Sequence, residues 1–192
     1  MKAMEKKILE EGKVLPGGIL KVGSFLNQQI DTSFLGEMAK EFARLYSDAG
    51  VNKVLTIESS GIAIAAAVAL EMGVPMVFAK KAKSDNIEGG LYQSDIYSYT
   101  YKKKVTLLVS KEWLSSDDKV LIIDDFMANG EAMRGLCDIV TAAGATLMGI
   151  GCAVEKGFQG GGDRLRAAGV SLKSLAIIES AEPGNIVFRD DD

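Results

Sequence analysis

Apolar and polar residues follow two different periods along this chain. In several segments apolar residues recur every three to four positions, and one segment consists mainly of small apolar residues, both typical of helices. These patterns predict helices over residues 3–11, 31–45, 62–72, 130–143 and 163–168. Asp31 is a suitable N-cap for the second helix, and Gly73 and Gly144 follow two others as stop signals.

Other segments are short and continuously apolar. These predict strands over residues 51–57, 74–79, 105–109, 119–123, 146–154 and 175–178. Strands that are apolar on both sides, with helices between them, indicate a parallel sheet that is covered on both faces. The pattern therefore predicts an α/β fold: a doubly wound, mostly parallel sheet with helices on both faces.

Two regions do not follow this alternation. Residues 80–104 are polar and lack a helical period, so we expect a long flexible loop there. Residues 1–30 and 175–192 are only loosely tied to the pattern and are expected to form a small hood. The length of 192 residues suits a single domain spanning 1–192.

Composition narrows the possible functions. Of all residues 47% are hydrophobic, enough for a full core, and the net charge of −4 argues against a nucleic-acid or anionic-membrane partner. The longest apolar stretch, 61–70, is about half a membrane span, and no secretory signal opens the chain. Cys137 and Cys152 lie in apolar segments and are expected to be reduced thiols of a cytoplasmic protein.

Histidine is absent from the sequence. This excludes Ser-His-Asp and Cys-His nucleophile systems, histidine-ligated zinc and an imidazole general base. An enzyme with this composition must use carboxylates, lysines, backbone N–H groups and a bound cation.

The segment most informative about chemistry is 119–133, where an apolar strand leads to Asp124 and Asp125 and then to a turn at Asn129-Gly130. Ligands of open α/β sheets bind at the carboxyl ends of the strands. A glycine turn that opens a helix offers N–H groups to a phosphate. Two other interpretations remain open at this point: a simple capped helix entry, and the acid cluster of a phosphoacceptor domain.

The run Ile-Ile-Asp-Asp-Phe-Met-Ala-Asn-Gly at 122–130 resembles the ribose-phosphate motif of type I phosphoribosyltransferases. Segments 19–31 and 154–159 resemble the bacterial members of that family that use xanthine, and the similarity covers essentially the whole chain. The family turn commonly reads Thr-Gly-x-Thr, whereas this chain has Asn129-Gly130-Glu131-Ala132. We expect the Glu131 side chain to point to solvent, away from a bound phosphate.

The resemblance implies transfer of a phosphoribosyl group from phosphoribosyl pyrophosphate (PRPP) to xanthine. The products are xanthosine 5′-monophosphate (XMP) and pyrophosphate. It also implies Mg²⁺ carried with PRPP, no direct protein metal ligand, and a homodimer. A carboxylate pair suits the cationic ribose of such a reaction, and the sequence leaves open which of the two acids contacts the base.

The resemblance further implies four groups of site residues. The catalytic pair is Asp124 and Asp125, and the PRPP-binding residues are Ala128, Asn129, Gly130, Glu131 and Ala132. The pyrophosphate group comprises Ser59, Ser60, Gly61 and Lys81, and the xanthine group comprises Leu20, Asn27 and Lys156.

Two alternative functions remain. A hypoxanthine-guanine or adenine enzyme of the same family would differ in only a few contacts to the base. A PRPP-sensing regulatory domain without catalysis would need a nucleic-acid-binding module, and the chain has neither a basic patch nor the length for one.

Overall fold

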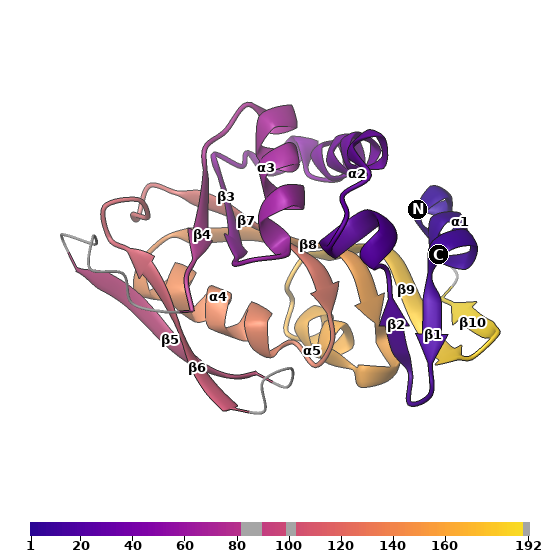
Figure 1. Ribbon diagram of the computed structural model, residues 1–192. Coiled ribbons are helices and arrows are strands. Elements are labelled where there is room, and N and C mark those ends of the chain that lie inside the picture. The colour runs from indigo at the N-terminus through magenta and orange to yellow at the C-terminus, as the bar shows by residue number, and fades with distance from the viewer. Residues whose placement is uncertain (82–89, 99–102, 190–192) are drawn as a thin grey trace.

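The computed structural model describes residues 1–81, 90–98 and 103–189, and in this part of the chain a six-stranded sheet forms the centre (Figure 1). The strands, in spatial order, are β10 (Asn185–Phe188), β9 (Leu172–Glu182), β8 (Thr146–Lys156), β7 (Lys119–Met127), β3 (Lys53–Ile57) and β4 (Met76–Ala79). Neighbouring strands run parallel, except that β10 pairs antiparallel with β9.

Helices cover both faces of this sheet (Figure 1). On one face lie α2 (Thr32–Leu45) and α3 (Gly61–Met72); on the other lie α4 (Glu131–Ala142) and α5 (Gly161–Ala167). Short helical turns span Gly23–Asn27, Ser47–Ala49 and Gly157–Gln159. None of the helices in the described ranges is both long and apolar enough to cross a membrane.

Strand β7 explains why both faces need a helical layer. Leu121 and Ile123 belong to the core that contains α2 and α3, whereas Val120 and Ile122 belong to the core beneath α4. All four side chains have no solvent exposure, because successive side chains of a strand point to opposite faces. The predicted doubly wound, mostly parallel sheet is confirmed.

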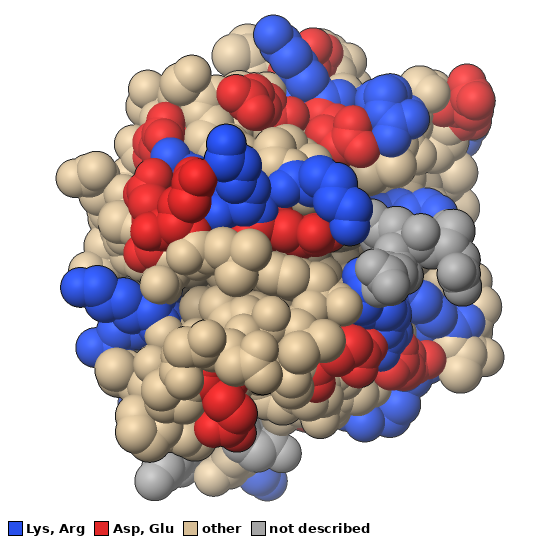
Figure 2. Space-filling model, turned by 90° about the vertical axis from the view of Figure 1, so that its right-hand side faces the viewer, with Lys and Arg blue, Asp and Glu red and all other residues tan. Residues whose placement is uncertain are grey.

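The N-terminal segment lies beside the last strands of the chain. It consists of α1 (Lys2–Glu11) and an antiparallel pair, β1 (Lys13–Leu15) and β2 (Ile19–Lys21), next to β9 and β10 (Figure 1). Met4 and Ile8 of α1 are fully buried in the same core as Leu175 and Ile178. Figure 2 shows this side of the molecule, where acidic and basic side chains lie intermingled around an uncharged area.

The prediction of a loop over 80–104 is wrong for much of its length. Two strands, β5 (Leu91–Ser98) and β6 (Lys103–Ser110), form an antiparallel hairpin that is separate from the main sheet. The apolar run 105–109 therefore lies in this hairpin and not in the parallel sheet. Residues 82–89 and 99–102 of the expected loop lie outside the described residues.

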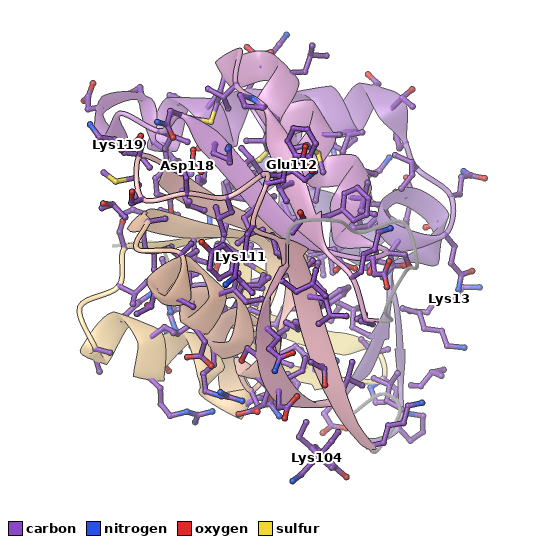
Figure 3. The ribbon with its side chains drawn as sticks, turned by 90° about the vertical axis from the view of Figure 1, so that its left-hand side faces the viewer. Lys13, Lys104, Lys111, Glu112, Asp118 and Lys119 are labelled. Atoms are coloured by element: carbon purple, nitrogen blue, oxygen red, sulfur yellow. The ribbon has the colours of Figure 1, made fainter. Side chains whose placement is uncertain are left out.

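Packing against the outer side of α4 stabilises the hairpin. Ser94 and Ile96 are buried alternate residues of β5, and a Cβ on Gly135 of α4 would lie 2.4 Å from Ile96 Cγ2. The glycine therefore allows the strand to approach the helix closely. Lys104 lies exposed at the far end of the hairpin (Figure 3).

Leu121→Ala tests the central role of β7. Removing a fully buried leucine side chain between two helical layers is expected to lower the free energy of unfolding by about 2–5 kcal/mol. The matched control is Leu70→Ala, because Leu70 on α3 is 84% exposed, and a change below about 0.5 kcal/mol is expected there. Urea denaturation measures both, and equal losses would contradict the assignment of the core.

Candidate active site

Strand β7 carries two acidic side chains into the interior. The strand runs to Met127 instead of ending at 123, because its pairing with β8 continues as far as Met127 opposite Glu155. Asp124 and Asp125 therefore lie within the strand rather than after it, and only 5% and 6% of their surfaces are exposed. Such burial requires partners for both carboxyl groups.

Asp125 finds its partner in the N-terminal segment. Its Oδ2 accepts a hydrogen bond from Asn27 Nδ2 at 3.2 Å, across 98 residues of sequence. Asn27 ends the helical turn that follows β2. The structure thus brings a residue of the expected xanthine group directly against one of the expected catalytic acids.

Asp124 lies against the first turn of α3. A Cβ on Gly61 would lie 2.5 Å from Asp124 Oδ1 and 2.3 Å from Thr56 Oγ1, so only glycine fits between these two groups. Asp124 Oδ1 also accepts the backbone N–H of Asp125 at 3.0 Å. Gly61, expected among the pyrophosphate residues, is buried and allows Asp124 and Thr56 to approach α3.

The surroundings of Asp124 shift the pKa of its carboxyl group. Burial raises the pKa of the Asp124 carboxyl well above its usual value, and the charge of Asp125 raises that pKa further. Lys81 and the N–H of Asp125 lower it, but to a smaller extent. The folded protein therefore favours a protonated Asp124, whereas positive charge placed next to the pair would favour the ionised form.

The loop after β7 forms the start of α4. Gly130 caps the helix with a φ of +83°, a conformation that favours glycine. Asn129 Oδ1 accepts the backbone N–H of Glu131 at 3.3 Å. The first N–H groups of a helix have no partner within the helix, so this end of α4 is suited to an anion.

The expectation that Glu131 points to solvent is wrong. Its Oε2 accepts a hydrogen bond from Arg134 Nη2 at 3.1 Å and lies 3.5 Å from the backbone nitrogen of Tyr97. The hydrogen bond from Arg134 lowers the pKa of the Glu131 carboxyl. An acid can occupy this turn because the arginine one helical turn later compensates its charge.

Most of the expected residues line one cleft of about 200 Å³. From β7 and the following loop it is lined by Asp124, Asp125, Ala128, Asn129, Glu131 and Ala132. Ser60 and Lys81 also line it, and the Lys81 backbone N–H donates to Glu58 Oε1 at 2.6 Å. An adjoining cavity of about 810 Å³ is lined by Ser59, Lys81, Lys103 and Lys104, among others. The acid pair, the start of α4 and several lysines therefore lie together around one edge of the sheet.

The remaining two residues of the expected xanthine group are Lys156 on β8 and Leu20 on β2. Lys156 ends β8, and its Nζ lies 5.6 Å from the centre of the Phe126 ring. Burial lowers the pKa of Lys156. Leu20 in β2 is 7% exposed and packs into the core of the N-terminal segment.

Sequence reasoning did not identify four residues that contact this site. Phe126 follows the acid pair directly, which is a signal that could have been used. Glu58 precedes the expected Ser59 and holds the backbone of Lys81. Arg134 lies three residues after Glu131 on α4, a spacing that could have been used as a signal, whereas Arg164 contacts the 128–132 loop from α5 and no local pattern marks it.

Across the described ranges, no group of three or more Asp, Glu, His or Cys side chains converges to hold a metal ion. The side-chain oxygen atoms that line the cleft include the carboxylates of Asp124, Asp125, Glu58 and Glu131 and the hydroxyl of Ser60.

Comparison with known proteins assigns the class. A family model described as a phosphoribosyl transferase domain matches residues 29–171. An APRTase from Giardia lamblia, solved in complex with 9-deazaadenine, superposes with a TM-score of 0.75 at 25% identity, over 91% of this chain and 96% of that one. An adenine phosphoribosyl transferase from Trypanosoma brucei was solved in complex with AMP, pyrophosphate and ribose-5-phosphate. It superposes with a TM-score of 0.74 at 21% identity, over 91% of this chain and 78% of that one. The chain thus has the fold of a phosphoribosyltransferase.

Curated relatives narrow the assignment. A xanthine phosphoribosyltransferase from Lachnoclostridium phytofermentans is 50% identical over the full length of both chains. One from Heliobacterium modesticaldum is 52% identical over 98% of this chain and all of its own. The chain belongs to the xanthine phosphoribosyltransferase family.

Asp124→Asn tests the pKa shift of the buried acid. Because folded Asp124 holds its proton more tightly than the unfolded chain does, wild-type stability falls as pH rises above the ordinary carboxyl pKa of about 4. The asparagine variant lacks this dependence. As pH rises above about 4, its free energy of unfolding should therefore increase relative to that of the wild type by up to about 1.4 kcal/mol per pH unit. Urea denaturation between pH 5 and pH 8 measures the difference. Asp48→Asn, at an exposed carboxylate, serves as the control, and parallel pH profiles for wild type and Asp124→Asn would refute the shift.

Proposed function

We propose that this chain catalyses transfer of the 5-phosphoribosyl group from PRPP to xanthine, giving XMP and pyrophosphate. In this reaction the bond from ribose C1 to the pyrophosphate oxygen breaks, a bond from C1 to a purine nitrogen forms, and that nitrogen loses its proton. The observation that carries the proposal is the single cleft shared by a buried acid pair and the start of α4. Membership of the family supports the same reaction.

Asp124 and Asp125 are proposed to bind the ribose. Each carboxyl group can accept a hydrogen bond from a ribose hydroxyl, and both lie where the sugar ring gains positive charge as the pyrophosphate leaves. The raised pKa of Asp124 fits this role, since the developing cation would favour its ionised form. The pair would therefore stabilise the transition state more than the neutral ground state.

Residues 128–132 are proposed to bind the 5′-phosphate of PRPP. Ala128 and Ala132 have no polar side-chain atoms, so binding would depend on the backbone N–H groups at the start of α4 and on the amide of Asn129. The pairing of Glu131 with Arg134 offsets part of the repulsion that a free acid would exert on this phosphate.

Ser59, Ser60, Gly61 and Lys81 are proposed to form the pyrophosphate end of the site. The hydroxyl groups and the lysine ammonium line the cleft and the adjoining cavity, whereas Gly61 contributes by leaving room for Asp124. Mg²⁺ carried with PRPP fits this site without a direct protein ligand, because Mg²⁺ keeps several water ligands and binds to substrate phosphates. When bound, it would neutralise charge on the leaving pyrophosphate.

Lys156, Asn27 and Leu20 are proposed to recognise the base. A lysine ammonium only donates hydrogen bonds, so Lys156 suits the carbonyl oxygens of xanthine and not the exocyclic amine of adenine. The Phe126 ring beside it can contact a flat purine, and Asn27 can both donate and accept. Asn27 donates a hydrogen bond to Asp125, so a base bound by Asn27 would be linked to the acid pair through this contact.

We also propose that the protein is a homodimer and is located in the cytoplasm. Phe78 and Trp113, which are 38% and 58% exposed, lie near the edge strand β4 and line a groove of about 390 Å³. Exposed apolar side chains of this kind often mark contacts between subunits. Cys137 and Cys152 are free thiols, as expected in a reducing compartment.

The test of the proposed function is an assay with four bases. The protein is incubated with PRPP and Mg²⁺, and xanthine, guanine, hypoxanthine and adenine are offered separately. We expect XMP formation with the highest kcat/KM, lower values for guanine and hypoxanthine, and no product from adenine. Absence of nucleotide with every base would refute an enzyme and favour a PRPP-sensing domain, whereas a preference for guanine would refute only the choice of base.

Lys156→Ala is expected to raise the KM for xanthine about 10- to 100-fold, because a hydrogen bond from a charged donor contributes about 1.5–3 kcal/mol. The KM for PRPP should change less than about two-fold. Lys119→Ala is the control, since Lys119 is exposed at the amino end of β7, away from the site (Figure 3). Equal increases in the KM for both substrates would contradict the role given to Lys156.

A further inference from the structure

Helix α5 touches the back of the 128–132 loop. A Cβ on Gly161 would lie 2.3 Å from the carbonyl oxygen of Ala128 and 2.6 Å from the nitrogen of Gly130. Real Cβ atoms do not approach backbone atoms so closely, so the first turn of α5 and the loop meet backbone to backbone. The position of the loop therefore depends on α5, although strand β8 and a short helical turn separate Gly161 from the loop in sequence.

Arg164 adds a directed contact to this packing. Its Nη2 donates to the carbonyl oxygen of Asn129 at 2.9 Å. That carbonyl and the N–H of Gly130 belong to one planar peptide group and point in opposite directions. By holding the carbonyl, Arg164 sets the direction of the Gly130 N–H at the start of α4.

The orientation of these N–H groups matters more here than in a loop with hydroxyl side chains. Ala132 offers no hydrogen-bond donor from its side chain. A phosphate bound in this loop would therefore rely on backbone donors, and a peptide group that rotated away would remove one of them.

Arg164 also brings positive charge to the loop, and this charge adds to the effect of Arg134 in lowering the pKa of the Glu131 carboxyl. Arg134, the other arginine at the loop, is shared between Glu131 at 3.1 Å and Asp138 at 2.9 Å. In the described part of the chain no carboxylate forms a salt bridge with Arg164, and its guanidinium donates a hydrogen bond to the carbonyl of Asn129. A small hollow of about 200 Å³ between the two arginines and the loop keeps the guanidinium solvated but close to the phosphate site.

We propose that Arg164 is a positioning residue for the phosphate loop: it orients the Asn129–Gly130 peptide group and supplies positive charge for the 5′-phosphate of PRPP. The inference rests on the proposed function, because it assumes that this loop binds that phosphate. It assigns Arg164 no contact with the base or with the reacting carbon.

Steady-state kinetics of Arg164→Ala and Arg164→Lys test the proposal. Arg164→Ala is expected to raise the KM for PRPP about 10-fold or more, and to change the KM for xanthine less than about two-fold. Arg164→Lys keeps the charge but not the planar fork, so it should lie between the wild type and the alanine variant. Arg44→Ala is the control, because Arg44 is an exposed arginine of α2 that forms an ion pair with Glu41.

Rescue by added guanidinium ion distinguishes a positioning role of Arg164 from a general loss of structure in the alanine variant. Added below denaturing concentrations, the ion should lower the KM of Arg164→Ala for PRPP and leave the wild type and Arg44→Ala unchanged. An unaltered KM for PRPP in Arg164→Ala would overturn the proposal. So would a parallel rise in both KM values without rescue, because that pattern indicates only a structural role.

Direct binding distinguishes failure of this inference from failure of the proposed function. If the wild type forms no nucleotide with any base, calorimetric titration with ribose 5-phosphate still compares wild type and Arg164→Ala. Weaker binding by the variant would support the role of Arg164 in a protein that binds the phosphate without catalysis. Equal binding would overturn it.

Discussion

The burial of two adjacent carboxyl groups on β7 is the constraint on which the other features of the site depend. An ionised carboxylate removed from water costs several kcal/mol unless neighbouring groups compensate. Asp125 is compensated by the amide of Asn27, and Asp124 by a backbone N–H and by a shift toward its neutral form. The acid pair thereby ties the N-terminal segment and the first turn of α3 to the central strand.

The main sheet could be predicted from sequence because its signals are local. The apolar run of β7 and the cap at Asp31 identify their elements without reference to distant residues, and Asp31 Oδ1 does accept the N–H of Phe34 at 3.1 Å. The hairpin could not be predicted in this way. Its alternating residues become buried only because Gly135 of α4 leaves room for Ile96, and that contact joins separate parts of the chain.

The same distinction applies to the site. The acid pair and the turn at 129–130 occupy one short stretch, so their chemistry was visible in sequence. The orientation of Glu131 was predicted wrongly, because its partner Arg134 was not considered. The resemblance to a known family pointed to Asn27 and Lys156, whose roles remain predictions. Nothing in the sequence pointed to Arg164, whose contact with Asn129 depends on how α5 packs.

The hydrogen bond between Asn27 and Asp125 has a consequence for biosynthesis. Residues near the start of the chain leave the ribosome early, yet Asn27 meets its partner only after 98 further residues have been made, and α1 packs beside β9, which is later still. Contacts between such distant segments form slowly, because a long loop must close first. A nascent chain would hold the acid pair and the 128–132 loop before β9 is available to α1. Docking of the N-terminal segment would therefore belong to the last stage of folding in this protein.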